Sequence, residues 1–110
     1  MNYETFILLD TIDTPAFEEY SAPIKGAGYN LQSSLHTYTY ELENFVGSIE
    51  LQGTLEVTPL DDDWVNIPEA EFWSDESTDL VTGNFEGNYV WVRAVYTLES
   101  GIIHKVRCNV

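Results

Sequence analysis

The side chains of segment 84–98, NFEGNYVWVRAVYTL, separate cleanly into two faces. With the two-residue period of a β-strand, one face carries Val90, Val92, Ala94, Tyr96 and Leu98. The other face carries Tyr89, Trp91, Arg93, Val95 and Thr97. The pattern predicts a strand that covers a core with its aliphatic side. Its second side, with aromatic rings around an arginine, is offered to a partner protein, a second sheet or a ligand.

Two further runs alternate in the same way. Segment 35–42, LHTYTYEL, predicts a strand with Tyr38, Tyr40 and Leu42 on one face. Segment 45–57, FVGSIELQGTLEV, alternates apolar and polar residues, which is typical of an antiparallel sheet with one wet face. Its inner face is predicted to carry Ile49, Leu51, Leu55 and Val57. Gly53 falls on the same face, where it leaves room for a bulge or for a large neighbouring ring.

The rest of the chain alternates in shorter pieces. Extended segments are predicted at 3–10, 17–24, 64–67, 70–73, 80–82 and 102–110, with a hairpin connection at Ser100 and Gly101. No helical period of convincing length occurs. The chain is therefore predicted to be a single all-β domain over residues 1–110. An antiparallel β-sandwich, with the jelly roll as one form of it, is preferred to a closed barrel, although the spacing of the strands fits both. Its predicted core residues are Ile49, Leu51, Val90, Val92 and Val106.

The charge restricts the classes of partner. Acidic residues number 19 against four basic ones, for a net charge of −15. Such a field repels phosphate and anionic lipid, so nucleic-acid binding and a membrane-surface role are disfavoured and a basic partner or assembly surface is favoured. The aromatic content of 14% argues for a folded chain. The N-terminus has no basic region, and its apolar run is too short for a signal peptide or a membrane span. This predicts a protein that is made and kept in a cytoplasm or assembled from one.

Several catalytic and metal-binding patterns can be considered. Segment 61–79 holds eight of the acidic residues, but its spacing does not match a calcium-binding EF-hand loop, so solvated loops are the favoured interpretation. No spacing singles out a carboxylate pair for glycoside hydrolysis. His36 and His104 lack the companions of a zinc site, and no nucleophile motif accompanies them. Cys108, the only cysteine, is expected to be a buried small hydrophobe. The sequence therefore predicts no enzyme, cofactor, metal ligand or catalytic residue.

The aromatic residues allow three interpretations: a well-filled core, a protein interface, or a platform for sugar rings. Tyrosine, tryptophan and arginine dominate the binding energy of protein interfaces when they are desolvated. The candidate interface residues are therefore Tyr89, Trp91 and Arg93.

The order of four motifs adds a resemblance. GAGYN at 26–30, LHTYTYELENFVGSIELQGTL at 35–55, DDDWVNI at 61–67 and FEGNYVWVRAVY at 85–96 follow one another as in small virion proteins of tailed bacteriophages, particularly cyanophages and other aquatic phages. The resemblance covers roughly residues 26–98. It implies a structural β-module of the particle, namely a capsid decoration or cement protein or a neck or tail component. Such a module is present as a homo-oligomer or in many copies and acts through contacts with other virion proteins. The alternative is a carbohydrate-binding module of a tail fibre that recognises the host surface.

Overall fold

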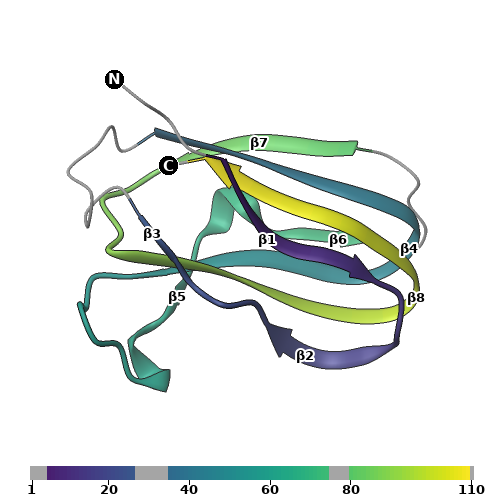
Figure 1. The fold of residues 1–110 in the computed structure, drawn as a ribbon, viewed down its shortest axis with the longest axis horizontal. Coiled ribbons are helices and arrows are strands. Elements are labelled where there is room, and N and C mark those ends of the chain that lie inside the picture. Colours follow the sequence, from purple (N-terminus) through teal and green to yellow (C-terminus); the bar gives the residue numbers. More distant parts are fainter. Residues whose placement is uncertain (1–4, 27–34, 75–79, 110) are drawn as a thin grey trace.

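The computed structural model describes residues 5–26, 35–74 and 80–109. Nearly all of this part of the chain is antiparallel strand, which confirms the all-β class (Figure 1). Two single turns of 3₁₀-helix, η1 (Asp61–Asp63) and η2 (Pro68–Ala70), interrupt the strands. The strands are β1 (Thr5–Ile12), β2 (Ala16–Tyr20), β3 (Ile24–Lys25), β4 (Leu35–Thr54), β5 (Val65–Asn66), β6 (Phe72–Ser74), β7 (Leu80–Glu86) and β8 (Trp91–Asn109).

The long strands β4 and β8 form the frame of the fold. They pair antiparallel over almost their whole length, from Tyr38 opposite Cys108 to Thr54 opposite Trp91. The first half of β4 also pairs with β7, and the second half of β8 with β1; we call these strands the β1–β7 layer. The second half of β4 pairs with β5 and β6, and the first half of β8 with β2 and β3; these form the β2–β6 layer.

Both layers belong to one open eight-stranded sheet. Figure 1 shows β4 and β8 bending together at the right of the view, so that the sheet folds over itself. Because the same two strands run through both layers, the predicted sandwich or jelly roll of separate sheets is not confirmed.

The bend depends on residues with positive φ angles. On β4, Asn44 has φ of 50° and Gly47 of 148°, and on β8 Gly101 has φ of 89°. The pairing of β4 with β8 shifts register on both sides of Val46. The hairpin predicted at Ser100 and Gly101 is wrong, since β8 continues through both residues. The glycine turns the strand without ending it, because β4 bends alongside.

The core lies between the two layers as one cluster. Ile49, Leu51, Val92 and Val106 are fully buried, as predicted, whereas Val90 precedes β8 and is half-buried. Cys108 is also buried, which confirms its expected role, and burial raises the pKa of its thiol to about 12.

Two tyrosines tie the η2 turn to β4. The hydroxyl of Tyr38 donates a hydrogen bond to the Glu69 carbonyl, and that of Tyr40 to the Ala70 carbonyl, both at 2.6 Å. Burial raises the pKa of the Tyr40 phenol far above its ordinary value, so this hydroxyl stays a donor. The connection between β5 and β6 is thereby held against the β1–β7 layer.

Two predicted strand faces need correction. Leu55 and Val57 are 72% and 67% exposed, because β4 ends at Thr54 and the alternation does not continue beyond it. On β8, strict alternation in segment 102–110 would place Ile102 on the same face as Val106 and Cys108. Ile103 is buried instead, because the register with β4 shifts and leaves His104 as an extra residue.

The segment boundaries also differ from the alternation. Segment 84–98 is not one strand: it comprises the end of β7, a connection at 87–90 and the first half of β8. The predicted strand at 17–24 is divided into β2 and β3, and that at 3–10 appears as β1, with residues 3 and 4 outside the described part.

Candidate functional site

The outer surface of the β2–β6 layer carries the candidate site, which we call the aromatic face and define by Tyr20, Gln52, Trp64, Trp91 and Arg93. Val92 and Ala94 of β8 enter the core, so Trp91 and Arg93 between them point outward. Arg93 is directly opposite Gln52 of β4, and directly opposed residues share a face of the sheet.

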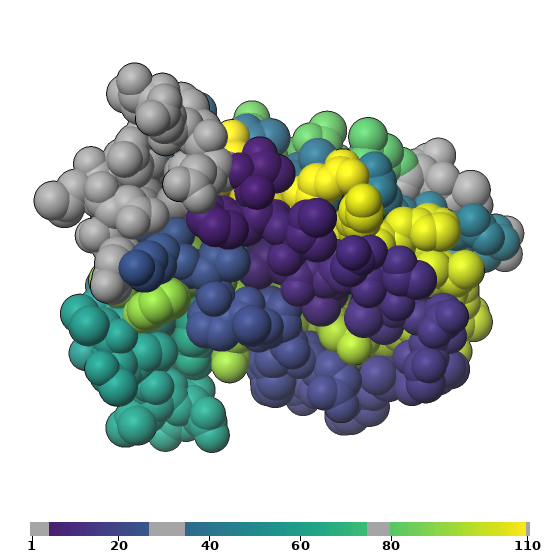
Figure 2. All heavy atoms as spheres, in the orientation of Figure 1, coloured from purple at the N-terminus to yellow at the C-terminus, as the bar shows by residue number. Residues whose placement is uncertain are grey.

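Arg93 lies between two aromatic rings. Its guanidinium carbon is 4.1 Å from the ring centre of Tyr20 on β2 and 4.3 Å from that of Trp64, which follows η1. In Figure 2 the residues after β4 form a teal lobe beside the blue N-terminal strands. Through its contacts with Tyr20 and Trp64, Arg93 connects β2 to the segment after β4. A guanidinium this close to two aromatic rings makes cation–π contacts with both, which are stronger where water is excluded.

Hydrogen bonds fix the edge of the same side chain. The Nε of Arg93 donates to Oε1 of Gln52 at 2.9 Å, and Nε2 of Gln52 donates to Oδ1 of Asn66 at 2.8 Å. The guanidinium is therefore held by two aromatic rings and by a hydrogen bond from its Nε. A planar fork held in this way is pre-organised to bind a carboxylate or a carbonyl with its terminal N–H groups.

Arg93 forms no direct ion pair among the described residues, although Asp61 is close enough to favour its charged form. Within the described ranges the ion pairs join His104 to Glu43 and Arg107 to Glu41, and Arg93 is in neither. Desolvation lowers the pKa of Arg93, while Tyr20 and Asp61 act in the opposite direction. Partial burial of an unpaired cation is unfavourable.

The structure brings Trp91 to the aromatic face but not Tyr89. The Trp91 indole donates to the Val57 carbonyl at 2.9 Å and so holds the segment after β4. Tyr89 packs against the core beside Gly53, where a Cβ would overlap its ring. The room predicted at Gly53 is thus confirmed, and the outward position predicted for Tyr89 is wrong. The strand alternation does not apply to Tyr89, because β8 begins at Trp91.

Sequence reasoning missed Tyr20, Trp64 and Gln52 as members of this face. Tyr20 belongs to an edge strand and Trp64 to a loop, and both reach Arg93 only through the tertiary fold. The one available signal was the tryptophan in DDDW, which directly follows three aspartates. A tryptophan is unusual at an otherwise polar turn, because this residue is highly buried on average in folded proteins.

The acidic segment 61–79 is described only in part, because residues 75–79 lie outside the described ranges. Asp63 accepts the backbone N–H of Leu60 at 2.7 Å and thereby stabilises η1. In the part of the chain that the structure describes, no three histidine, cysteine or acidic side chains gather as a metal site would require. Over the same part, no helix is long and apolar enough to cross a membrane.

Both histidines make structural contacts. His36 is fully buried, stacks on Phe85 with ring centres 4.6 Å apart, and faces the carbonyl oxygens of Asn109 at 3.0 Å and Gly87 at 3.3 Å. His104 is half-buried and lies 3.1 Å from a carboxylate oxygen of Glu43.

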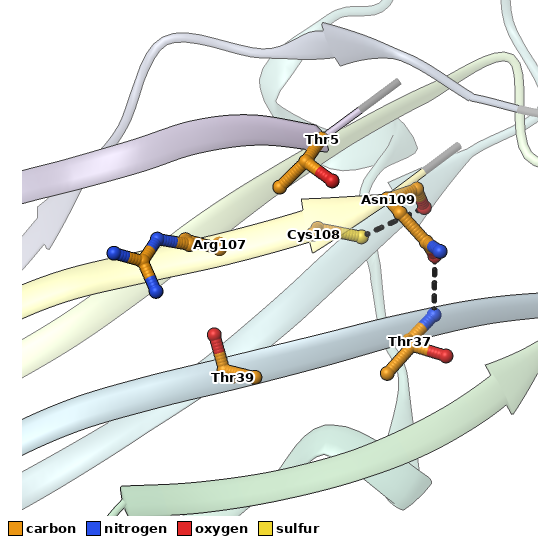
Figure 3. Close-up of a pocket in the computed structure, with 6 residues that line it drawn as sticks. All are labelled: Thr5, Thr37, Thr39, Arg107, Cys108 and Asn109. Carbon is orange, nitrogen blue, oxygen red and sulfur yellow. Dashed lines mark hydrogen bonds between the residues drawn. The ribbon is translucent and has the colours of Figure 1, made fainter. Parts of the chain in front are cut away.

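A shallow hollow on the outer surface of the β1–β7 layer contains an unpaired hydroxyl (Figure 3). Among the described residues, Oγ1 of Thr39 is buried and has no hydrogen-bond partner. By contrast, Oγ1 of Thr37 donates to Oδ1 of Asn84 at 2.8 Å. The hollow is lined by Thr5, Thr37, Thr39, Arg107, Cys108 and Asn109.

We expect Thr39→Val to raise the free energy of unfolding by about 1 kcal/mol, because it removes a desolvated, unsatisfied hydroxyl and keeps the side-chain shape. Urea denaturation measures the change. The matched control is Thr37→Val, which is expected to lower stability because it removes a hydrogen bond. A Thr39→Val variant less stable than the wild type would show that the hydroxyl is satisfied in solution.

Comparison with known proteins assigns the chain to no group: no protein-family model matches it, and neither does any curated protein.

Proposed function

We propose that this chain is a non-enzymatic virion structural protein of a tailed bacteriophage, a capsid decoration protein or a neck or tail component, that works through protein–protein contacts. The observation that carries the proposal is the stacked but unpaired Arg93 on the aromatic face. The order of motifs along the sequence supplies the virion context, with other virion proteins as partners, many copies on a particle and assembly in the host cytoplasm.

The composition of the face supports a contact with a protein. Trp91, Tyr20 and Arg93 are the residue types that contribute most to interface energies. Their geometry is already set by stacking and hydrogen bonds. Less side-chain entropy is then lost on association, which favours affinity.

The charges support a particular chemistry in the partner. The terminal N–H groups of Arg93 can donate hydrogen bonds to a carboxylate or a carbonyl oxygen on the partner. The net charge of −15 favours basic groups around that acceptor. A partner surface that fits this face therefore carries one acceptor surrounded by lysine or arginine.

Replacing Arg93 by alanine is expected to weaken assembly at least about tenfold, which is the loss typical of an interface hot spot. Because Arg93 is only half-buried, the fold should persist. Occupancy on particles lacking this protein, measured after adding back the purified variant, tests the result, and circular dichroism checks the fold.

Arg107→Ala is the matched control, since Arg107 lies on the outer surface of the other layer and is paired with Glu41. Arg93→Lys keeps the charge but loses the planar fork, so it should fall between the wild type and the alanine variant. Wild-type occupancy of a folded Arg93→Ala variant would refute the aromatic face as the contact.

A further inference from the structure

A second feature of the β2–β6 layer lies at β6. Trp73 is directly opposite Ser48 of β4, so its ring is on the outer surface of the sheet, where it is 73% exposed. Glu50 follows two residues after Ser48 and has the same orientation. These side chains border a surface hollow with Glu71 and Phe72. A large exposed ring beside a hollow marks a candidate binding site.

The carboxylates at this hollow have unused acceptor capacity. Within the described ranges, neither the Glu50 nor the Glu71 side chain forms a hydrogen bond or an ion pair. Desolvation raises the pKa of Glu50, and the nearby Glu71 and Glu18 raise it further. A half-buried carboxylate in this state is stabilised by a hydrogen-bond donor.

We propose that the hollow binds a neutral sugar ring, with Trp73 stacked on the C–H face of the ring and Glu50 and Glu71 accepting hydrogen bonds from its hydroxyl groups. A pyranose has an apolar face and a rim of hydroxyl donors. The hollow can match both features of the sugar. The flat ring of Trp73 can pack against its apolar face, and the unpaired carboxylates beside the ring can accept hydrogen bonds from its hydroxyl groups.

We choose a sugar over a cation because the exposed aromatic ring, and not the negative charge, distinguishes this hollow from the rest of the surface. Carboxylates are spread over the whole chain, so negative charge does not single out the hollow. What singles out the hollow is the exposed ring of Trp73 beside it. The site uses none of the residues that define the aromatic face, so it is independent of the proposed contact through Arg93.

The test is a titration of the isotopically labelled protein with the methyl glycosides of glucose, galactose, mannose and N-acetylglucosamine, followed by nuclear magnetic resonance. We expect at least one glycoside to give saturable shifts of the Trp73 indole N–H and the Ser48 amide. The dissociation constant should be millimolar, about 1–10 mM, as the binding energy of so small a ligand allows.

Three variants decide the interpretation. Trp73→Ala should weaken binding at least about tenfold without loss of the fold, since the ring is exposed, and Glu50→Gln should weaken it less. Phe17→Ala is the matched control, because Phe17 is a similarly exposed ring, at 85%, that does not line the hollow. It should leave the affinity unchanged.

The absence of saturable shifts with all four glycosides would overturn the sugar site. If arginine amide gave saturable shifts in that case, the hollow would be a cation site. Particle occupancy of Trp73→Ala separates this inference from the proposed virion contact. That occupancy should equal the wild type even when sugar binding is lost.

Discussion

Replacing Gly47 by alanine is expected to lower the free energy of unfolding by at least about 3 kcal/mol. This is a large share of the total free energy of unfolding of a domain of this size. Gly47 has φ of 148°, a conformation that L-residues rarely adopt. An added Cβ would also overlap the carbonyl oxygen of Thr97, a backbone atom of the paired strand β8. The clash has no flexible side chain to absorb it, so the bend of β4 must open.

Urea denaturation of the two proteins measures this loss. Ser100→Ala is the control, because Ser100 lies opposite Val46 in the same bend and is exposed. It should change stability by no more than about 0.5 kcal/mol. If Gly47→Ala costs less than about 1 kcal/mol, the bend tolerates a side chain and does not depend on this glycine.

Leu51→Ala is expected to cost about 2–5 kcal/mol, while Leu55→Ala should cost almost nothing. Both positions fall on the inner side of one alternating run, and alternation alone assigns them the same face. In the structure Leu51 is fully buried, whereas Leu55 is 72% exposed beyond the end of β4. Truncating the first leaves a cavity, and truncating the second removes atoms that already contact water.

The pair of variants is its own control, since the substitution is chemically identical. Chemical denaturation of both proteins gives the two differences in stability. Similar large losses at the two positions would mean that β4 continues past Thr54 in solution. Small losses at both would mean that the inner and outer faces of β4 are reversed.

The orientation and burial of several side chains could be predicted from the local sequence pattern. The inward positions of Val92, Ala94 and Leu98 followed from alternation, because every second residue of a regular strand faces the same way. The outward positions of Trp91 and Arg93 followed from the same rule. The burial of Cys108 followed from its chemistry, and the room at Gly53 from the missing Cβ. Each of these depends on a residue and its near neighbours within one strand.

By itself, then, the sequence determined the all-β class, four of its five predicted core residues and two of the five residues of the aromatic face. The tertiary structure decided where strands end and which distant groups meet. Tyr89 packs against the core because β8 begins only two residues later, so the strand alternation does not include it. Arg93 contacts two aromatic rings because β2 and the segment after η1 both lie against it in the tertiary fold. The physical reason is that alternation records which side of its own strand a residue occupies. Bends, register shifts and contacts between segments depend on the pairing partner, which local pattern does not specify.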